Sequence, residues 1–330
     1  MNLEQEFGGK RALITGGMGF IGSNLALALV KLGTRVTIVD SMIPGYGGNL
    51  FNIEPAAQEI NANFCDVLDV NAINHLVRGQ DFIFHLAGQV DHILSLSDPF
   101  PDIDLNIKGT AVMMEACRRH NAGVRFIFTG TRGQYGPAVS LPASEDAPTN
   151  PKGIYEVSNL TAEKIIQVYN DVHNIHSVLL RLTNIYGPRA QMAHSRYGVV
   201  NWFVRLAIEK TPIKVFGDGL IRRDFLFVDD CVEALLMSAV TDQARGQILN
   251  VGVDHPTNFL ALAKTLVEIC PGACWEYAEF TPERKAQEPG DFFSDIRKIR
   301  KLVGWSPKTE LADGLRQTVD YYMKFGRHYW

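Results

Sequence analysis

Short apolar runs alternate with amphipathic stretches through the first half of the chain. The runs are rich in branched and aromatic residues and predict strands, whereas the stretches repeat their apolar residues at helical spacing. Strands are expected at residues 12–15, 36–39, 82–86, 126–129 and 177–182, and helices between them at residues 21–32, 70–77, 104–120 and 155–173. Strands that alternate with helices in this way build a parallel sheet. We therefore expect the α/β class, with a Rossmann-type doubly wound parallel sheet.

The pattern loosens after Gly187, where prolines and glycines divide the chain into shorter segments. Helices are still expected at residues 200–209, 229–240 and 311–325. We divide the chain accordingly. Residues 1–185 form the Rossmann domain, to which part of 225–255 returns, and residues 186–330 form mainly a smaller C-terminal α/β lobe that binds substrate.

Composition and charge remove several classes of function. Positive and negative residues are mixed and the formal net charge is -4, so no basic face is available for nucleic acid. No stretch is apolar over the length of a bilayer, and residues 1–10 lack the features of a signal peptide. Cys270 and Cys274 lack the second Cys/His pair that a zinc site needs. We expect a cytoplasmic protein with no metal, no disulfide and no nucleic-acid or membrane partner.

A glycine-rich turn points to a dinucleotide cofactor. Gly16, Gly19 and Gly22 lie between the first strand and the first helix, where glycines let the backbone approach a pyrophosphate at the helix N-terminus. Such a turn alone also occurs in other α/β proteins. Here Asp40 ends the second strand, where a carboxylate bonds ribose hydroxyls and repels a 2′-phosphate. The pair of features favours NAD over NADP.

Further motifs follow these residues in order along nearly the whole chain. They are TGGMGFIG at 15–22, Cys65-Asp66-Val67, HLAGQ at 85–89, Asn106 with Gly109-Thr110, TGTRGQYG at 129–136, Tyr155, RLTNIYGPR at 181–189, FGDG at 216–219, RRDFLFVDD at 222–230, and PGD and GWSP near the end. Through these motifs the chain resembles the extended short-chain dehydrogenase/reductase family, in particular its nucleotide-sugar epimerases, dehydratases and decarboxylases. The resemblance extends the expected NAD site to Phe20, Ile21, Asp66, Val67, Leu86, Ala87, Gly88, Gln89 and Asn106.

The resemblance also implies a catalytic pair. Thr131 and Tyr155 match the hydroxyl groups that flank the C4 hydroxyl of the sugar in such enzymes. A tyrosinate there removes the hydroxyl proton as a hydride leaves the carbon for the nicotinamide. Epimerisation follows when the ketone turns over and receives the hydride on its other face.

The chain departs from the family at Asn159, where the pattern Tyr-x-x-x-Lys requires lysine. By that resemblance the lysine bonds the nicotinamide ribose and lowers the pKa of the tyrosine, so without it Tyr155 should be a weaker base at neutral pH. Either another cation substitutes or the redox chemistry is slowed or lost. The candidate cations are Arg132, Lys152 and Lys164. Our hypothesis is that Arg132 supplies the positive electrostatic field that the absent lysine would provide near Tyr155.

A second departure concerns the type of reaction. Related 4,6-dehydratases follow the threonine with an Asp-Glu pair, whereas this chain has Arg132 and Gly133. We expect no acid at this point, which disfavours dehydration, and the Glu of the decarboxylases is absent as well. His92 is expected in a loop without a nucleophile, and His85 as a buried histidine with satisfied hydrogen bonds.

Four residues are expected on the substrate side. By resemblance, Asn184 and Arg223 hold the diphosphate, Asp291 bonds the ribose of the nucleotide, and Val200 lines the base pocket. Arg223 could instead form a salt bridge to Asp224 or Asp229, and Asn184 could be a turn residue. The family often has an arginine shortly before PGD, whereas this chain has Glu288, with Arg284 four residues earlier. The nucleotide base therefore stays open.

Together these features predict an NAD-dependent nucleotide-sugar epimerase, with C4 of a UDP-hexose or UDP-hexuronate as the preferred target. The alternatives are a CDP-sugar 2-epimerase, an NDP-sugar 4,6-dehydratase, a reductase and a non-catalytic NAD-binding protein. By resemblance we also expect a homodimer through the helices at 104–120 and 155–173.

Overall fold

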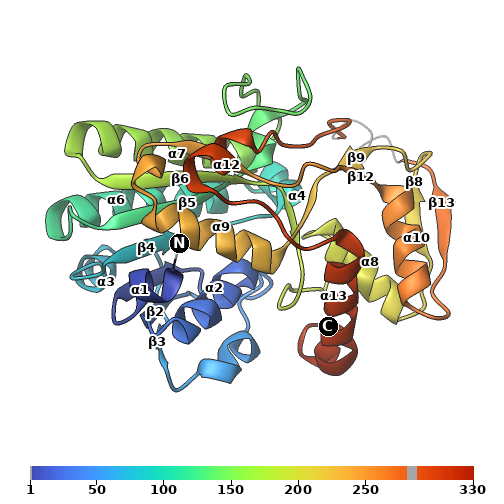
Figure 1. The fold of residues 1–330 in the computed structure, drawn as a ribbon, viewed down its shortest axis with the longest axis horizontal. Helices are drawn as coiled ribbons and strands as arrows, with labels where there is room; N and C mark the ends of the chain where they lie inside the picture. The colour runs from blue at the N-terminus through green and yellow to red at the C-terminus, as the bar shows by residue number, and fades with distance from the viewer. Residues whose placement is uncertain (1, 281–287) are drawn as a thin grey trace.

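A parallel sheet forms the centre of the larger lobe in the computed structural model, which describes residues 2–280 and 288–330 (Figure 1). Its strands are β1 (Arg11–Thr15), β2 (Arg35–Val39), β3 (Ile60–Asn63), β4 (Phe82–His85), β5 (Arg125–Thr131), β6 (His176–Leu182) and β11 (Ile248–Val251). Their order is β3-β2-β1-β4-β5-β6-β11, and every pair is parallel. The chain reverses its direction of growth between β1 and β4, where open α/β sheets bind ligands. The predicted Rossmann-type fold is confirmed.

Helices cover both faces of this sheet. The helices of the larger lobe are α1 (Leu3–Phe7), α2 (Phe20–Lys31), α3 (Val70–Leu76), α4 (His92–Ser97), α5 (Phe100–Asp102), α6 (Gly109–His120), α7 (Ile154–His173), α9 (Val228–Val240) and α12 (Arg297–Val303). A π-helical turn, Ile103–Lys108, precedes α6, so the helix expected at 104–120 has two parts. Helices α3, α6 and α7 pack together, while α2 packs against α9 (Figure 1).

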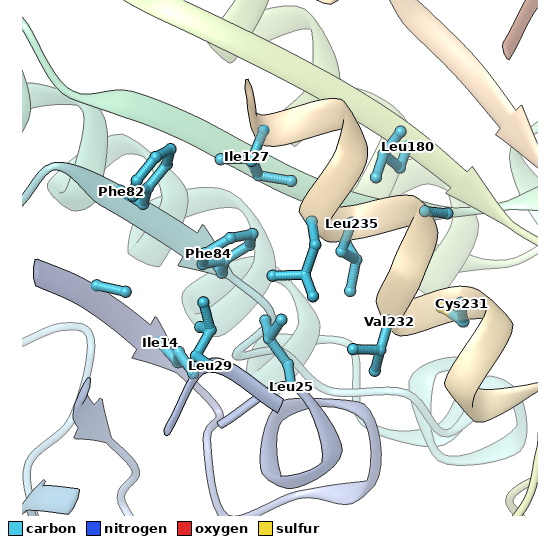
Figure 2. Close-up of a cluster of buried hydrophobic side chains, with 14 of the residues drawn as sticks. Ile14, Leu25, Leu29, Phe82, Phe84, Ile127, Leu180, Cys231, Val232 and Leu235 are labelled. Atoms are coloured by element: carbon cyan, nitrogen blue, oxygen red, sulfur yellow. The ribbon is translucent and has the colours of Figure 1, made fainter. Parts of the chain in front are cut away.

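Apolar side chains on the two faces of the strands explain this layering. Successive strand residues point to opposite faces, so Ile14 joins the core beneath α2 and α9 whereas Leu13 joins the core beneath α6 and α7. Figure 2 shows the first core, in which Leu25 of α2 and Leu235 of α9 approach strand side chains such as Phe84. Strands buried on both faces read as continuous apolar runs, which is why the sequence revealed them.

The smaller lobe has its own core. It contains α8 (Val199–Ile208), α10 (Phe259–Ile269) and α13 (Leu311–Phe325), with the short strand pairs β7 (Asn184–Tyr186) and β10 (Phe225–Phe227), β8 (Ile213–Phe216) and β13 (Trp275–Ala278), and β9 (Arg222–Arg223) and β12 (Thr257–Asn258). After β10 the chain returns to the large sheet through α9 and β11 (Figure 1). Among the described residues, no helix combines the length and apolarity needed to cross a membrane.

Candidate active site

One pocket of about 780 Å³ receives residues from both lobes at the carboxyl ends of the central strands. Most residues that the sequence singled out line it. They are Gly16, Gly19, Phe20, Ile21, Gly22, Asp40, Val67, Leu86, Ala87, Gly88, Gln89, Asn106, Thr131, Arg132, Tyr155, Asn159, Asn184 and Val200. Asp66, Arg223 and Asp291 are not among its lining residues.

The glycine turn at the start of α2 fits the pyrophosphate of a dinucleotide. Gly16 has a φ of +70°, and a Cβ on it would lie 2.9 Å from the backbone nitrogen of Ala87. A Cβ on Gly22 would lie 2.2 Å from the carbonyl oxygen of Gly16. Because Gly19 occupies the N-cap without a capping side chain, the first amides of α2 keep their donors for an anion.

Asp40 is fixed at the adenosine side of the pocket. Its two carboxylate oxygens accept hydrogen bonds from the backbone nitrogens of Met18, at 3.0 Å, and Met42, at 2.9 Å. The remaining lone pairs can accept from ribose hydroxyls, which supports NAD as the cofactor. Asp66 instead accepts from the nitrogen of Leu68 at 2.9 Å, and its neighbours Cys65 and Val67 line the pocket.

A buried polar network ties the loop after β4 to the helices that carry the chemistry. The Asn106 amide accepts from the nitrogen of Gln89 at 2.9 Å and donates to Ser158 Oγ at 3.0 Å. Ser158 Oγ donates in turn to the carbonyl oxygen of Tyr155 at 2.8 Å. Gln89 and Asn106 therefore line the pocket and also hold the start of α7 in place.

Thr131 and Tyr155 meet in the pocket. Thr131 Oγ1 accepts from the nitrogen of Gly133 at 3.1 Å, which leaves its hydroxyl proton for the Tyr155 phenol. Burial raises the pKa of Tyr155 well above its ordinary value, and the hydrogen bond from Thr131 and the charge of Arg132 act in the opposite direction. Glu156 and Asp102 raise that pKa further. Little of the phenol is therefore present as the reactive tyrosinate at neutral pH in the surroundings that the protein provides.

Asn159 lines the pocket one helical turn after Tyr155. Its amide nitrogen donates to the carbonyl oxygen of Tyr155 at 2.9 Å, so its amide oxygen is the group left for a ribose hydroxyl. An amide in this place brings no positive charge to the phenol.

Two of the three candidate cations line the pocket. Arg132 stacks on the Phe292 ring, with Cζ 5.2 Å from the ring centroid, and makes no hydrogen bond or ion pair to any residue in the described ranges. Burial and the neighbouring charge of Arg223 lower the pKa of Arg132 to about 10, so it remains a cation at neutral pH. Lys152 also lines the pocket, whereas Lys164 lies outside it and donates to Gln167 at 3.0 Å.

The expectation that no acid stands beside Gly133 is wrong. The side chain of Glu156 lies over that glycine, since a Cβ on Gly133 would be 2.6 Å from Glu156 Cγ. Glu156 Oε1 is 2.5 Å from His92 Nδ1. Burial would raise the pKa of Glu156, but the hydrogen bond from His92 and the charges of His92 and Arg132 hold it below its ordinary value. The carboxylate escaped notice because it comes from another segment of the chain.

His92 is also placed differently from the prediction. It begins helix α4 and is not in a loop, and its ring meets the Tyr155 ring edge-on with centroids 4.7 Å apart. His85 agrees with its prediction, because its two ring nitrogens lie 2.8 Å from Thr15 Oγ1 and 3.1 Å from Thr110 Oγ1. Burial lowers the pKa of His85 to about 4, so it stays neutral.

The predicted substrate residues divide into two groups. Asn184 and Val200 line the pocket. Arg223 is buried and pairs with Glu288, so the alternative partners Asp224 and Asp229 are wrong. Asp291 accepts from Arg222 Nε at 2.8 Å. Substrate contacts of these four residues stay predictions, and Arg284 lies outside the described residues.

Loops that carry no motif close one end of the pocket. Tyr46, Arg196 and Tyr197 line it, and the Tyr197 hydroxyl donates to the carbonyl oxygen of Gly45 at 3.2 Å. Arg196 Nη1 lies 3.2 Å from Asp91 Oδ2. The loop at 41–49, which contains Tyr46, could be either a cover for the adenosine or substrate or a mere surface loop on sequence grounds. No motif marks Arg196 or Tyr197, because irregular loops acquire their positions from tertiary contacts.

Comparison with known proteins identifies relatives that match nearly the whole chain. The model of the NAD dependent epimerase/dehydratase family matches residues 12–252. The chain is 33% identical to a UDP-glucose 4-epimerase of Mycolicibacterium smegmatis, over 94% of this chain and 98% of that protein. It is 30% identical to a dTDP-glucose 4,6-dehydratase of Streptomyces niveus, over 97% of this chain and 94% of that protein. A crystal structure of UDP-glucuronic acid 4-epimerase from Bacillus cereus, in complex with UDP-glucuronic acid and NAD, superposes with a TM-score of 0.85 at 28% identity, covering 96% of this chain and 99% of that one.

Proposed function

This chain belongs to the NAD dependent epimerase/dehydratase family, with NAD as its cofactor, and on that premise we propose that it epimerises a nucleotide sugar at C4. The preferred substrate is a UDP-hexose or UDP-hexuronate. The observation that carries the proposal is the meeting of Thr131 and Tyr155 in the same pocket as the glycine turn and Asp40. A secondary alcohol held there faces both a proton acceptor and the cofactor site.

Residues of this chain supply the proton chemistry. Bound NAD would accept a hydride from the sugar carbon and return it to the resulting ketone. Tyr155 takes the proton of the C4 hydroxyl, and the Thr131 hydroxyl donates a hydrogen bond that stabilises the tyrosinate as it forms. Arg132 contributes a positive charge close to that phenol in place of the lysine that Asn159 replaces.

The UDP-sugar assignment has separate support. UDP-glucose 4-epimerase and UDP-glucuronic acid 4-epimerase are names of relatives that match nearly the full chain. Asn184 and Val200 line the end of the pocket that the smaller lobe contributes, where a nucleotide would lie beside α8. The Arg132 guanidinium feels the charges of Asp224, Glu288 and Glu156 but forms no direct ion pair with a described side chain, so it can also face a carboxylate on the sugar.

A panel of nucleotide sugars tests the proposal. The purified protein with NAD is incubated with UDP-, CDP-, GDP- and dTDP-sugars, and epimers are detected by NMR. We expect C4 epimers from a UDP-hexose or UDP-hexuronate, and their loss in Tyr155→Phe. Binding of NAD without turnover of any sugar would instead identify a non-catalytic NAD-binding protein.

A further inference from the structure

Two glycines make room for the Glu156 side chain beside the reacting groups. A Cβ on Gly133 would lie 2.6 Å from Glu156 Cγ, and a Cβ on Gly153 would lie 2.3 Å from Glu156 Oε2. Both distances are shorter than real Cβ contacts, so larger residues at either position would displace the carboxylate. Glu156 Oε2 is buried and has no hydrogen-bond partner within the described part of the chain. A buried oxygen without a hydrogen-bond partner lowers the stability of the fold, and one explanation for such an atom is a catalytic role.

His92 completes an acid–base pair with this carboxylate. Its Nδ1 lies 2.5 Å from Glu156 Oε1, and Asp91 fixes its place by accepting from the nitrogens of Ile93 and Leu94 at 3.0 Å. The His92 side chain is 53% exposed and lines the pocket. Residues 2–280 and 288–330 offer its Nε2 no hydrogen-bond partner, so this nitrogen is free to meet a substrate.

The groups around the pair favour the carboxylate form of Glu156. Arg132 and His92 hold Glu156 in its ionised form, whereas Asp102 is the nearby group of like charge. A carboxylate that holds Nδ1–H leaves Nε2 as the base, which is the arrangement of carboxylate–histidine pairs in other acid–base sites. Tyr155 cannot take this second role, because it holds the proton of the C4 hydroxyl during the redox step.

We propose that His92, oriented by Glu156, exchanges the hydrogen on the sugar carbon next to C4. This inference rests on the proposed function, since that hydrogen becomes acidic only when C4 is a ketone. His92 Nε2 takes the proton, the C–H electron pair forms the carbon–carbon double bond of the enolate, and the carbonyl pair moves onto oxygen. Return of a proton from the imidazolium restores the ketone, and exchange of that proton with water carries solvent hydrogen into the sugar.

Deuterium incorporation separates this step from hydride transfer. The protein with NAD is incubated with UDP-glucose or UDP-glucuronic acid in D₂O, and the recovered sugars are analysed by NMR. Hydride return by itself brings no solvent deuterium to any carbon. We expect deuterium at the carbon beside C4, and a ratio of exchange to epimerisation that falls on the order of a hundredfold in His92→Asn and Glu156→Gln.

Controls make each outcome decisive. His173→Asn, at the exposed end of the helix α7 that carries Glu156, should leave both exchange and epimerisation unchanged. Glu156→Asp should retain part of the exchange that Glu156→Gln loses. Epimers without deuterium, or equal exchange in wild type and His92→Asn, would overturn this inference and leave the proposed function standing. Absence of epimers with every sugar overturns both. Should Glu156→Gln fail to fold, His92→Asn alone decides.

Discussion

Tyr155 stands in an environment that opposes its ionisation. Burial and the carboxylates of Glu156 and Asp102 raise its pKa, while Thr131 and Arg132 lower it. Because Asn159 brings no charge, Arg132 is the pocket cation that favours the tyrosinate. The sign of the pH dependence follows: the base form grows with rising pH, so turnover should rise from neutral towards alkaline pH.

Arg132→Ala tests whether the charge of Arg132 lowers the pKa of Tyr155. Without the guanidinium the pKa of Tyr155 rises further, so kcat should fall by roughly tenfold and the rising limb of the pH–rate profile should move to higher pH. Arg132→Lys keeps the charge and should keep most of the rate. An unchanged kcat and profile in Arg132→Ala would refute the role of this cation.

At the residue level the sequence predicted those site residues that belong to contiguous motifs. The glycines and Asp40 lie between or at the ends of the predicted strands and helices, so they could be inferred from local order, whereas Thr131 and Tyr155 were assigned by resemblance to the family. Glu156 and His92 escaped because 64 positions separate them in the chain and only the packing of α4 against α7 joins them. Arg223 was expected to bind the diphosphate or to form a salt bridge to Asp224 or Asp229, but its partner Glu288 comes from a distant segment.

Helix α7 shows how one element organises the site. Tyr155, Ser158 and Asn159 are separated by three and four residues, so they lie on one face of the helix. That face meets the pocket and the network of Asn106, while Glu163 on the next turns forms a buried pair with Arg181 of β6 at 2.7 Å. The helix is therefore anchored to the sheet close to the point where Tyr155 leaves it.

The turn before α2 gives a prediction at the scale of an element. Gly22→Ala places a methyl group against the Gly16 carbonyl, which must shift the turn from its pyrophosphate geometry at a cost of about 1–3 kcal/mol. NAD binding measured by calorimetry should weaken by about tenfold to a hundredfold. Gly123→Ala is the control, because nothing lies within 4 Å of the added carbon. Equal affinities in the two variants would contradict the assignment of this turn to the cofactor.

Helices whose apolar residues repeat at regular helical spacing were predicted from the sequence, whereas two strands without a clear pattern of apolar residues were not. Helix α13 spans the predicted residues 311–325, and α2, α7 and α9 differ from prediction by one residue at their ends. Strand β3 was missed because its sequence, INAN, is mostly polar at the edge of the sheet. Strand β11 was missed since its membership in the sheet depends on pairing with β6.

Both lobes contribute to one pocket at the scale of the whole molecule. The contact of Tyr197 with Gly45 links the segment after β7 to the loop after β2, across the end of the pocket. Residues far apart in sequence therefore enclose the cofactor and substrate sites together. In the function that we propose, the larger lobe holds the redox groups and the smaller lobe selects the nucleotide.

Assembly into a homodimer remains our prediction for the whole molecule. Helices α6 and α7 lie side by side on the outer surface of the larger lobe (Figure 1). Val168 and Val172, one helical turn apart on α7, are 55% and 68% exposed. We expect a dimer in analytical ultracentrifugation and its dissociation by Val168→Asp with Val172→Asp.

Val139→Asp serves as the control for the dimer, because Val139 is 75% exposed and lies between β5 and α7, on neither of these helices. A monomeric wild type, or a dimer that survives the paired substitutions, would show that α7 is not the interface.

The central claim is that a hydride leaves C4 and returns to it within one active site. The most direct measurement uses a UDP-sugar deuterated at C4, turned over with NAD in ordinary water and followed by NMR. We predict that the C4 epimer keeps its deuterium, because the hydride never meets solvent. Loss of the label to water would contradict hydride return and with it the proposed mechanism.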